Sequence, residues 1–291
     1  MFHIEVGLDR DCYIKSESDD KCVDYQFGTK QELILTRNGK EAINLLLQAL
    51  HLQPDEEVFI TSTFGTKYVS KCVTCSVFNY CQPSKVITEK TKVIYIIHEF
   101  GVPHPETFNL IEFAKEKEIF VVEDCAHSSN SFFDQKNKIG GFADFSIYSL
   151  KKIFPMNTGG VLAVKNAKYK NKIEVLDNDP ERNEIESKFD EFAPLNDLFS
   201  QKRKDNHARL ERFVKAKCHF QSSKLISPYV FSIELIQAKK FCEKFNEHYG
   251  NMYECVTWFG LDVVSFPVHQ LMNDKDIDDL ARKINQILDK I

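Results

Sequence analysis

Residues 92–129 read KVIYIIHEFGVPHPETFNLIEFAKEKEIFVVEDCAHSS, and their successive patterns point to one architecture. KVIYIIH (92–98) is a nearly continuous apolar run, which is typical of a strand buried on both faces of a sheet. ETFNLIEFAKEK (106–117) has apolar residues at helical spacing, and IFVVED (119–124) is a second buried strand. A strand, a helix and a strand in this order form a βαβ unit, so we predict an α/β fold with a mostly parallel central sheet flanked by helices.

The sequence on both sides of this unit extends the same pattern. Upstream, ILTRNGKEAINLLLQALHL (34–52) predicts a short strand, a turn at Asn38-Gly39 and a helix, and EVFITS (57–62) predicts another strand. Downstream, DFSIYS (144–149) and GGVLAV (159–164) predict two strands on either side of a lysine pair. We therefore expect residues 1–170 to form one large α/β domain.

The sequence changes character after the last of these strands. IEVLDNDPERNEIESKFDEF (173–192) is acidic and weakly periodic, so we expect an acidic linker over residues 171–197. Residues 198–291 are expected to form a small, α-rich C-terminal domain, with helices near 198–217, 232–247 and 273–291.

Composition narrows the class of protein. The net charge of −5 argues against binding to a phosphate backbone, and no apolar run approaches the ~20 residues that cross a bilayer. The N-terminus lacks a basic segment followed by an apolar one, and the nine cysteines show no framework spacing, so we expect a cytoplasmic protein with reduced thiols. Cys72 and Cys75 have C-x-x-C spacing but no second pair follows, so we interpret them as packing residues.

Three groups of residues could carry chemistry at the carboxyl ends of the strands. They are Glu123, Asp124 and His127; Ser146, Ser149, Lys151 and Lys152; and the Gly39 turn, which precedes a helix whose free N–H groups favour a phosphate. A lysine, a carboxylate and a phosphate nest together suggest a pyridoxal phosphate site. The lysine would form a Schiff base and move protons. The carboxylate would hold a proton on the pyridine nitrogen, an interaction worth roughly 5 kcal/mol at ~3.5 Å and an effective dielectric of about 20.

At this point the sequence resembles a known family. VIYIIHEFGVPH, LIEFAKEKEIFVVEDCAHS and KIGGFADFSIYSLKKIFPMNTGGVLAV are similar to the DegT/DnrJ/EryC1/StrS aminotransferases over residues 33–165. FPVHQLMNDKDIDDLARKINQIL resembles that family's closing helix. The resemblance implies a fold-type-I pyridoxal phosphate architecture and a homodimer. It also implies transfer of an amino group from glutamate to a keto-sugar nucleotide.

The resemblance also implies roles for individual residues. Asp124 matches the residue that pairs with the pyridine nitrogen, His127 the residue beside the phenolic oxygen, and Ser146 a phosphate-binding serine. Phe64 matches the aromatic residue that stacks on the ring. The loop whose N–H groups hold the phosphate matches Gly39, Lys40 and Glu41, with Asn38 and Lys40 in place of the family's Ser and Thr.

Two lysines compete for the Schiff base. Counted from Ser146, Lys151 fits the family's common FSxxxxK spacing. YSLKKIFPMNTGG fits better a subgroup with a basic residue directly before the lysine, and this favours Lys152. A neighbouring cation would also lower the pKa of the reacting amine.

Alternative interpretations remain open. The family's Gly/Asn/Arg segment after the lysine is not recognisable here, so the chain could be a non-catalytic, scaffold relative. His98, Glu123, Asp124 and His127 could instead hold a metal, an interpretation that we rank low. QKRKDNHARLERFVKAK (201–217) is interpreted as the solvated face of a helix and not as a nucleic-acid site.

Overall fold

The structure is a computed structural model that describes residues 32–66, 69–165, 169, 172–173, 180–258 and 260–291. Its larger sheet has the order β1-β7-β6-β5-β4-β2-β3. Strands β2 to β6 pair in parallel, whereas β7 runs antiparallel to both β6 and β1. The strands are β1 (Glu32–Thr36), β2 (Glu57–Ser62), β3 (Gln82–Ser84), β4 (Thr91–Ile97), β5 (Phe120–Asp124), β6 (Phe145–Tyr148) and β7 (Gly160–Val164).

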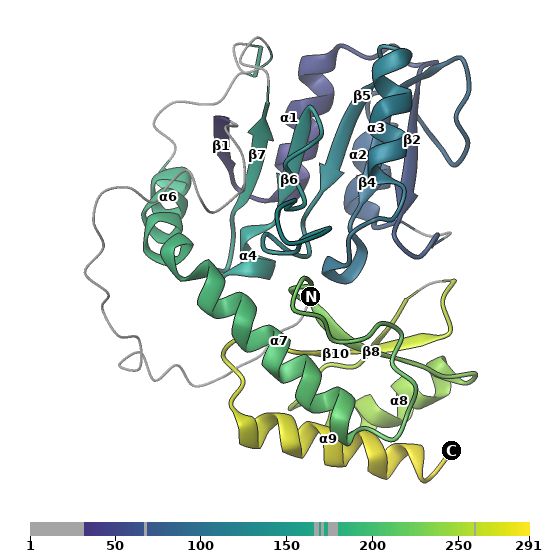
Figure 1. Cartoon of the computed structure of the whole chain (residues 1–291), viewed down its shortest axis with the longest axis vertical. Coiled ribbons are helices and arrows are strands. Elements are labelled where there is room, and N and C mark those ends of the chain that lie inside the picture. Colours follow the sequence, from purple (N-terminus) through teal and green to yellow (C-terminus); the bar gives the residue numbers. More distant parts are fainter. Residues whose placement is uncertain (1–31, 67–68, 166–168, 170–171, 174–179, 259) are drawn as a thin grey trace.

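Helices cover both faces of this sheet, as the apolar strands predict (Figure 1). One face packs on α1 (Gly39–Leu50) and α2 (Lys71–Phe78), and the other packs on α3 (Thr107–Glu116). Successive residues of a strand point to opposite faces. Tyr95 of β4 therefore belongs to the core beneath α1 and α2, while its neighbours Ile94 and Ile96 belong to the core beneath α3.

The C-terminal part contains a second, smaller sheet that the sequence analysis did not predict. Strands β8 (Val230–Glu234), β10 (Val263–Pro267) and β9 (Val256–Thr257) are antiparallel in the order β8-β10-β9. It packs with α8 (Ala238–Tyr249) and α9 (Asp274–Leu288) below the larger sheet, and α7 (Asn196–Phe213) runs alongside (Figure 1). The helix expected near 232–247 thus begins six residues later, because residues 230–234 are a short buried run that periodicity cannot assign.

Much of the expected linker is helical. Helix α6 (Pro180–Phe192) and the 3₁₀ turn Ala193–Leu195 lead directly into α7. Ile185 and Phe189 are buried at a spacing of four residues in the core beside α4 (Leu150–Ile153). Because only these two residues of α6 are buried, the apolar residues of this segment are too few to show a helical period in the sequence. The boundaries of the three expected segments stay a prediction.

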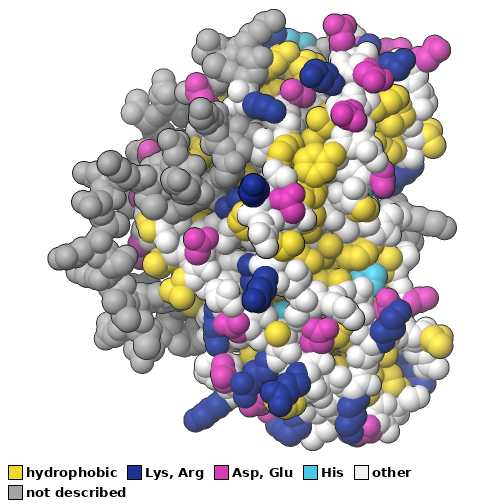
Figure 2. Space-filling view, viewed as in Figure 1, with side chains coloured by type: hydrophobic (Ala, Val, Ile, Leu, Met, Phe, Trp, Pro, Cys, Tyr) yellow, Lys and Arg dark blue, Asp and Glu magenta, His cyan; other side chains and the backbone are white. Residues whose placement is uncertain are grey.

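Charged side chains gather along the bottom of the molecule and also at its top in Figure 2. In the C-terminal part, ion pairs join α7 to α9, for example Lys202 with Asp274 and Arg209 with Asp278. Within the described parts of the chain, no helix is both long and apolar enough to cross a membrane. The prediction that Cys72 and Cys75 are packing residues is wrong, because both are exposed on α2.

Candidate active site

Asp124 is the last residue of β5, at the carboxyl edge of the parallel strands. Its side chain is 6% exposed. The Tyr95 hydroxyl donates to Oδ2 at 2.8 Å, and the Ala126 N–H donates to Oδ1 at 2.9 Å. Two donors therefore fix the plane of the carboxylate. Each oxygen keeps a further lone pair, because a carboxylate offers about four acceptor positions.

His127 follows in the loop after β5. The Phe100 N–H donates to its Nδ1 at 3.0 Å, so the proton of the neutral ring lies on Nε2. Burial lowers the pKa of His127 well below its ordinary value, and the positive charges of Lys152 and Arg203 lower it further. The ring stacks on Tyr229, with centroids 4.5 Å apart and planes 7° apart. His127 is thus held neutral, with Nε2–H as its donor.

The lysine pair lies in the single turn α4, after β6. Burial lowers the pKa of Lys152; the negative charges of Asp124 and Cys72 oppose this shift, and the positive charge of Lys151 adds to it. The Lys152 Nζ lies 5.4 Å from the centroid of the Tyr229 ring. Within the described residues, this amine forms no hydrogen bond or ion pair. Of the two lysines, Lys152 is the one that acts electrostatically on both Asp124 and His127.

The start of α1 lies close to this turn. Asn38 caps the helix, since its Oδ1 accepts from the Glu41 N–H at 3.0 Å. The β-bridge between Asn38 and Gly159 directs the Gly39 N–H toward the Gly159 carbonyl, whereas the Lys40 N–H has no acceptor within the described residues. A Cβ added to Gly39 would lie 3.7 Å from the Ser149 Cβ, so Ser149 lies beside the first residue of α1. A free N–H group at the positive end of a helix, with a serine nearby, favours an anion.

The Gly159-Gly160 pair joins the lysine turn to α1. The Leu150 N–H donates to the Gly159 carbonyl at 3.0 Å, and the Gly159 N–H donates to the Arg37 carbonyl at 2.7 Å. A Cβ on Gly160 would lie 2.5 Å from the backbone of Asn38. No side chain fits there, so the close approach of the two segments requires glycine.

Ser146 and Phe64 occupy different places relative to this site. Ser146 lies opposite Glu123 in the β5–β6 register, one residue before the level of Asp124, and its fully buried hydroxyl donates to the Gly140 carbonyl at 2.7 Å. The geometry therefore places Ser149, and not Ser146, beside the start of α1. Phe64 packs on His219, with ring centroids 4.3 Å apart, in the same apolar cluster as Phe100 and Tyr229, and its stacking on a cofactor ring stays a prediction.

The residues considered for a metal have other partners. His98 donates from Nε2 to Glu123 at 3.1 Å, and Glu123 also accepts three backbone N–H groups. Among the described residues, no group of three His, Cys, Asp or Glu side chains could hold a metal ion.

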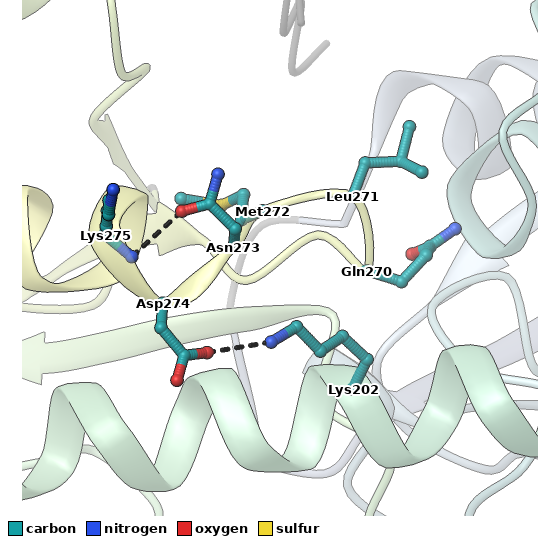
Figure 3. Close-up of a pocket in the computed structure, with 7 residues that line it drawn as sticks. All are labelled: Lys202, Gln270, Leu271, Met272, Asn273, Asp274 and Lys275. Carbon is teal, nitrogen blue, oxygen red and sulfur yellow. Dashed lines mark hydrogen bonds and ion pairs between the residues drawn. The ribbon is translucent and has the colours of Figure 1, made fainter. Parts of the chain in front are cut away.

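A separate pocket of about 610 Å³ lies between α7 and the start of α9 (Figure 3). Lys202 reaches across it to Asp274 at 3.0 Å, and none of the candidate catalytic residues lines it. Gln270 connects this pocket to α4, because its amide donates to the Ile153 carbonyl at 3.1 Å. The size of this pocket therefore does not identify the site of the chemistry.

Residues 25–193 match the model of the DegT/DnrJ/EryC1/StrS aminotransferase family, which is more than half of the chain. The chain belongs to this family. The GDP-perosamine synthase of Escherichia coli O157:H7 is 32% identical over 146 residues, which are 45% of this chain and 39% of that protein. A UDP-N-acetyl-3-dehydro-alpha-D-glucosamine 3-aminotransferase of Acidithiobacillus ferrooxidans is 26% identical over 48% of this chain and 42% of its own length. The chain thus spans about two fifths of the curated relatives that it matches.

Solved structures of aminotransferases share the fold over nearly the whole chain. PseC of Helicobacter pylori has a TM-score of 0.74 at 16% identity, covering 91% of this chain and 88% of that chain. A putative sugar aminotransferase, Spr1654 of Streptococcus pneumoniae in its PLP-form, has a TM-score of 0.72 at 14% identity, covering 91% and 89%. These similarities confirm the predicted α/β architecture of this DegT/DnrJ/EryC1/StrS family member.

Three residues at the site were missed by the sequence analysis. Tyr95 lies inside the apolar strand β4, where a buried tyrosine hydroxyl needs a hydrogen-bond partner; this need is the sequence signal that could have identified it. Tyr229 and Arg203 come from the C-terminal part, and nothing in the local sequence connects them to Asp124. Arg203 also belongs to the stretch interpreted as a solvated helix face, yet it is only 4% exposed.

The donor set fits pyridoxal phosphate, the cofactor that the family resemblance implies. Lys152 is an amine with a lowered pKa and no ion pair among the described residues. Asp124 is an oriented carboxylate, and His127 keeps a donor on Nε2. The start of α1 offers the Lys40 N–H and the positive end of the helix for a phosphate. An amine, a carboxylate, a hydrogen-bond donor and an anion site are the groups that such a cofactor needs.

Proposed function

We propose that this protein is a pyridoxal phosphate-dependent aminotransferase that moves an amino group from glutamate to a keto-sugar nucleotide. The observation that carries the proposal is Lys152, whose pKa is lowered and whose charge acts on both Asp124 and His127. The names of the relatives, a GDP-perosamine synthase and a UDP-sugar aminotransferase, support the sugar nucleotide as the acceptor. A homodimer in the cytoplasm, acting in surface-polysaccharide or amino-sugar synthesis, belongs to the same proposal.

Bound pyridoxal phosphate would supply a carbonyl that reacts with amines and a ring that accepts electrons from the substrate carbon. The protein residues then have separate tasks. Lys152 provides Nζ, first as the nucleophile and then as the group that takes and returns a proton. A lowered pKa suits both tasks, because the amine must be unprotonated to attack and must exchange a proton near neutral pH.

Asp124 holds a proton on the ring nitrogen through its negative charge. Tyr95 orients this carboxylate by donating to Oδ2, which leaves the other oxygen and the remaining lone pairs for the cofactor. His127 donates from Nε2 to an oxygen of the cofactor, and its low pKa keeps the ring neutral so that it adds no positive charge beside Lys152.

The start of α1 binds the phosphate. The Lys40 N–H and Ser149 would hold it, and the positive end of the helix dipole would add to the attraction. Because the Gly-Gly pair ties α1 to the turn with Lys152, the phosphate and the amine are held at a fixed separation.

The test is a visible absorbance spectrum of the protein mixed with pyridoxal phosphate, followed by borohydride reduction and peptide mass mapping. We expect a visible band of the bound cofactor and a label on Lys152. Lys152→Ala should lose both, whereas the matched variant Lys151→Ala should keep them. A label on Lys151 would keep the enzyme and correct the assignment of the lysine. No band and no label in the unaltered protein would overturn the proposal.

A non-catalytic relative that keeps the fold is the second candidate. The position of Tyr229 favours it, because its ring stacks on His127 and lies next to Lys152. If Tyr229 occupies the space of the cofactor, Tyr229→Ala should bind pyridoxal phosphate and the unaltered protein should not. If both bind it with similar affinity, this second candidate is excluded.

A further inference from the structure

Two cysteines of the C-terminal part lie in contact with each other. Cys242 is on α8, and Cys255 directly precedes β9, thirteen positions further along the chain. The Cys242 thiol donates to the carbonyl oxygen of Cys255, with Sγ 3.0 Å from that oxygen. The two thiol groups are also within hydrogen-bonding distance of each other. The Cys242 side chain is therefore directed at Cys255, and both cysteines are free.

Asn246 holds the backbone of Cys255 at this place. It follows Cys242 by four residues, so the two side chains share one face of α8. Its Nδ2 donates to the Cys255 carbonyl at 2.7 Å, and its Oδ1 accepts from the Cys255 N–H at 3.1 Å. The same Nδ2 lies 3.4 Å from the Cys242 Sγ. One side chain thus keeps the two cysteines face to face, which is the arrangement that a disulfide bond requires.

The two thiols differ in exposure and in acidity. Cys255 is 1% exposed, whereas Cys242 is half-buried. A hydrogen bond from the Cys255 thiol lowers the pKa of Cys242; burial opposes this shift, and a hydrogen bond from Asn246 adds to it. Burial raises the pKa of Cys255, and the neighbouring Cys242 raises it further. The thiolate is the reactive form of cysteine, so Cys242 is the nucleophile of the pair and Cys255 is the thiol that reacts second.

We propose that Cys242 and Cys255 are a redox site that a low-molecular-weight disulfide oxidises to an intramolecular disulfide bond. The Cys242 thiolate attacks one sulfur of the small disulfide, whose S–S bond breaks and releases one thiolate. Cys255 loses its proton and attacks the Cys242 Sγ of this mixed disulfide, which releases the second small thiolate. The two cysteines are thereby oxidised, the small disulfide is reduced to two thiols, and the two protons pass to the thiolates released. This site does not depend on the proposed aminotransferase function.

The bond would join α8 to a segment that reaches the candidate active site. Trp258 directly follows β9. Its ring centroid lies 4.8 Å from that of Phe100 and 6.2 Å from that of His127. A covalent link at Cys255 therefore fixes β9 at the end opposite Trp258. Because a cross-link restricts the unfolded chain, the oxidised protein should also be more stable than the reduced protein.

The test is incubation of the unaltered, folded protein with oxidised and reduced glutathione in a series of ratios. Acid quenching, alkylation of the free thiols and peptide mass mapping without reduction then locate the bonds. We expect a pair of peptides linked through Cys242 and Cys255, and its loss when reduced glutathione is added in excess. Mapping distinguishes this bond from any that forms between Cys72 and Cys75, which are exposed on α2.

Single substitutions separate the two steps. Cys242→Ser should form no such bond and should leave the buried Cys255 unmodified, whereas Cys255→Ser should stop at a mixed disulfide on Cys242. Cys218→Ser is the matched control and should still form the bond. Cys218 is also half-buried, but burial raises its pKa to about 11. In the unaltered protein, Cys242 should therefore react with oxidised glutathione at least roughly tenfold faster than Cys218.

The melting temperature provides a second measurement. After the same oxidation, the unaltered protein should melt roughly 5 °C or more above Cys242→Ser. Cysteines 242 and 255 that stay free in excess oxidised glutathione would overturn the proposal, and so would a bond that forms only in denaturant. A bond that forms without raising the melting temperature would overturn it as well, because the native contact would then have been broken to make it. If Cys255→Ser does not fold, the unaltered protein and Cys242→Ser decide.

Discussion

Replacement of Glu123 by Gln tests how the end of β5 is held in place. Glu123 is fully buried, directly before Asp124. Its Oε1 accepts from His98 Nε2 at 3.1 Å and from the Gly140 N–H at 2.9 Å. Its Oε2 accepts from the N–H groups of Phe142 and Ala143, both at 3.0 Å. The carboxylate thus satisfies four donors at once.

A glutamine at this position can satisfy only half of them. Its side chain has one acceptor oxygen and one NH₂ group, so two of the four donors would face another donor. Each buried donor left unsatisfied costs about 1–3 kcal/mol, so Glu123→Gln should lower the free energy of unfolding by roughly 2–6 kcal/mol. Domains are typically stable by only about 5–15 kcal/mol, so this loss should be obvious.

The same carboxylate should make stability depend on pH. Burial raises the pKa of Glu123, but the hydrogen bond and charge of His98 and the backbone N–H groups outweigh it, and the pKa lies below its ordinary value. A carboxylate with a lowered folded pKa contributes stability that is complete above the unfolded pKa, about 4.3, and is lost as the pH falls through the folded value. The difference between the unaltered protein and Glu123→Gln should therefore shrink below about pH 4.

Urea unfolding followed by circular dichroism, at pH 7 and in a series of lower pH values, measures both effects. The matched control is Glu112→Gln on the exposed face of α3, which should change the free energy of unfolding by less than about 0.5 kcal/mol. A loss below about 1 kcal/mol in Glu123→Gln at pH 7 would refute the reasoning, and so would a difference that does not change with pH.

Three further changes test other contacts by the same unfolding measurement. Tyr95→Phe removes the donor to the buried Asp124 and should cost about 1.5–3 kcal/mol; a loss under about 0.5 kcal/mol would contradict this hydrogen bond. Asn38→Ala removes the cap of α1 and should cost about 1 kcal/mol, and unchanged stability would argue against the cap. Gly101→Ala should be strongly destabilising, because φ is +88° and the new Cβ would lie 2.4 Å from a backbone oxygen of residue 227; a folded variant of normal stability would refute that contact.

Most strands of the larger sheet could be predicted, because each is recognised from a single continuous stretch of the sequence. The buried runs of β4 and β5 and the helix between them are each complete within one stretch of chain, and β2 has the predicted bounds. Asp124 and His127 could be named for the same reason, since they directly follow a strand that is easily recognised. Residues 230–234 show the limit of this approach, because four buried residues in a row have no period that separates a strand from a helix.

The contacts of the site could not be predicted, because they join distant segments. Whether Ser146 or Ser149 faces α1 depends on the register between β5 and β6, and the sequence of one strand does not contain that register. Tyr229 reaches His127 from more than a hundred residues away along the chain. Arg203 looks like any other charged residue of α7 until the packing of α7 against α4 buries it.

The backbone hydrogen bonds of Gly159 limit which part of the protein could move to admit a substrate. Its two backbone hydrogen bonds, one to Leu150 and one to Arg37, close the lysine turn into a short loop that is tied to the start of α1. This loop cannot swing outward without breaking both bonds and separating Gly160 from the backbone that it touches. On the other side of the lysine lies Tyr229, directly before β8, and its N–H donates to the Phe100 carbonyl. Because Arg203 and Gln270 also bond to the backbone of the lysine turn, the C-terminal part could move away from the lysine only by breaking these bonds.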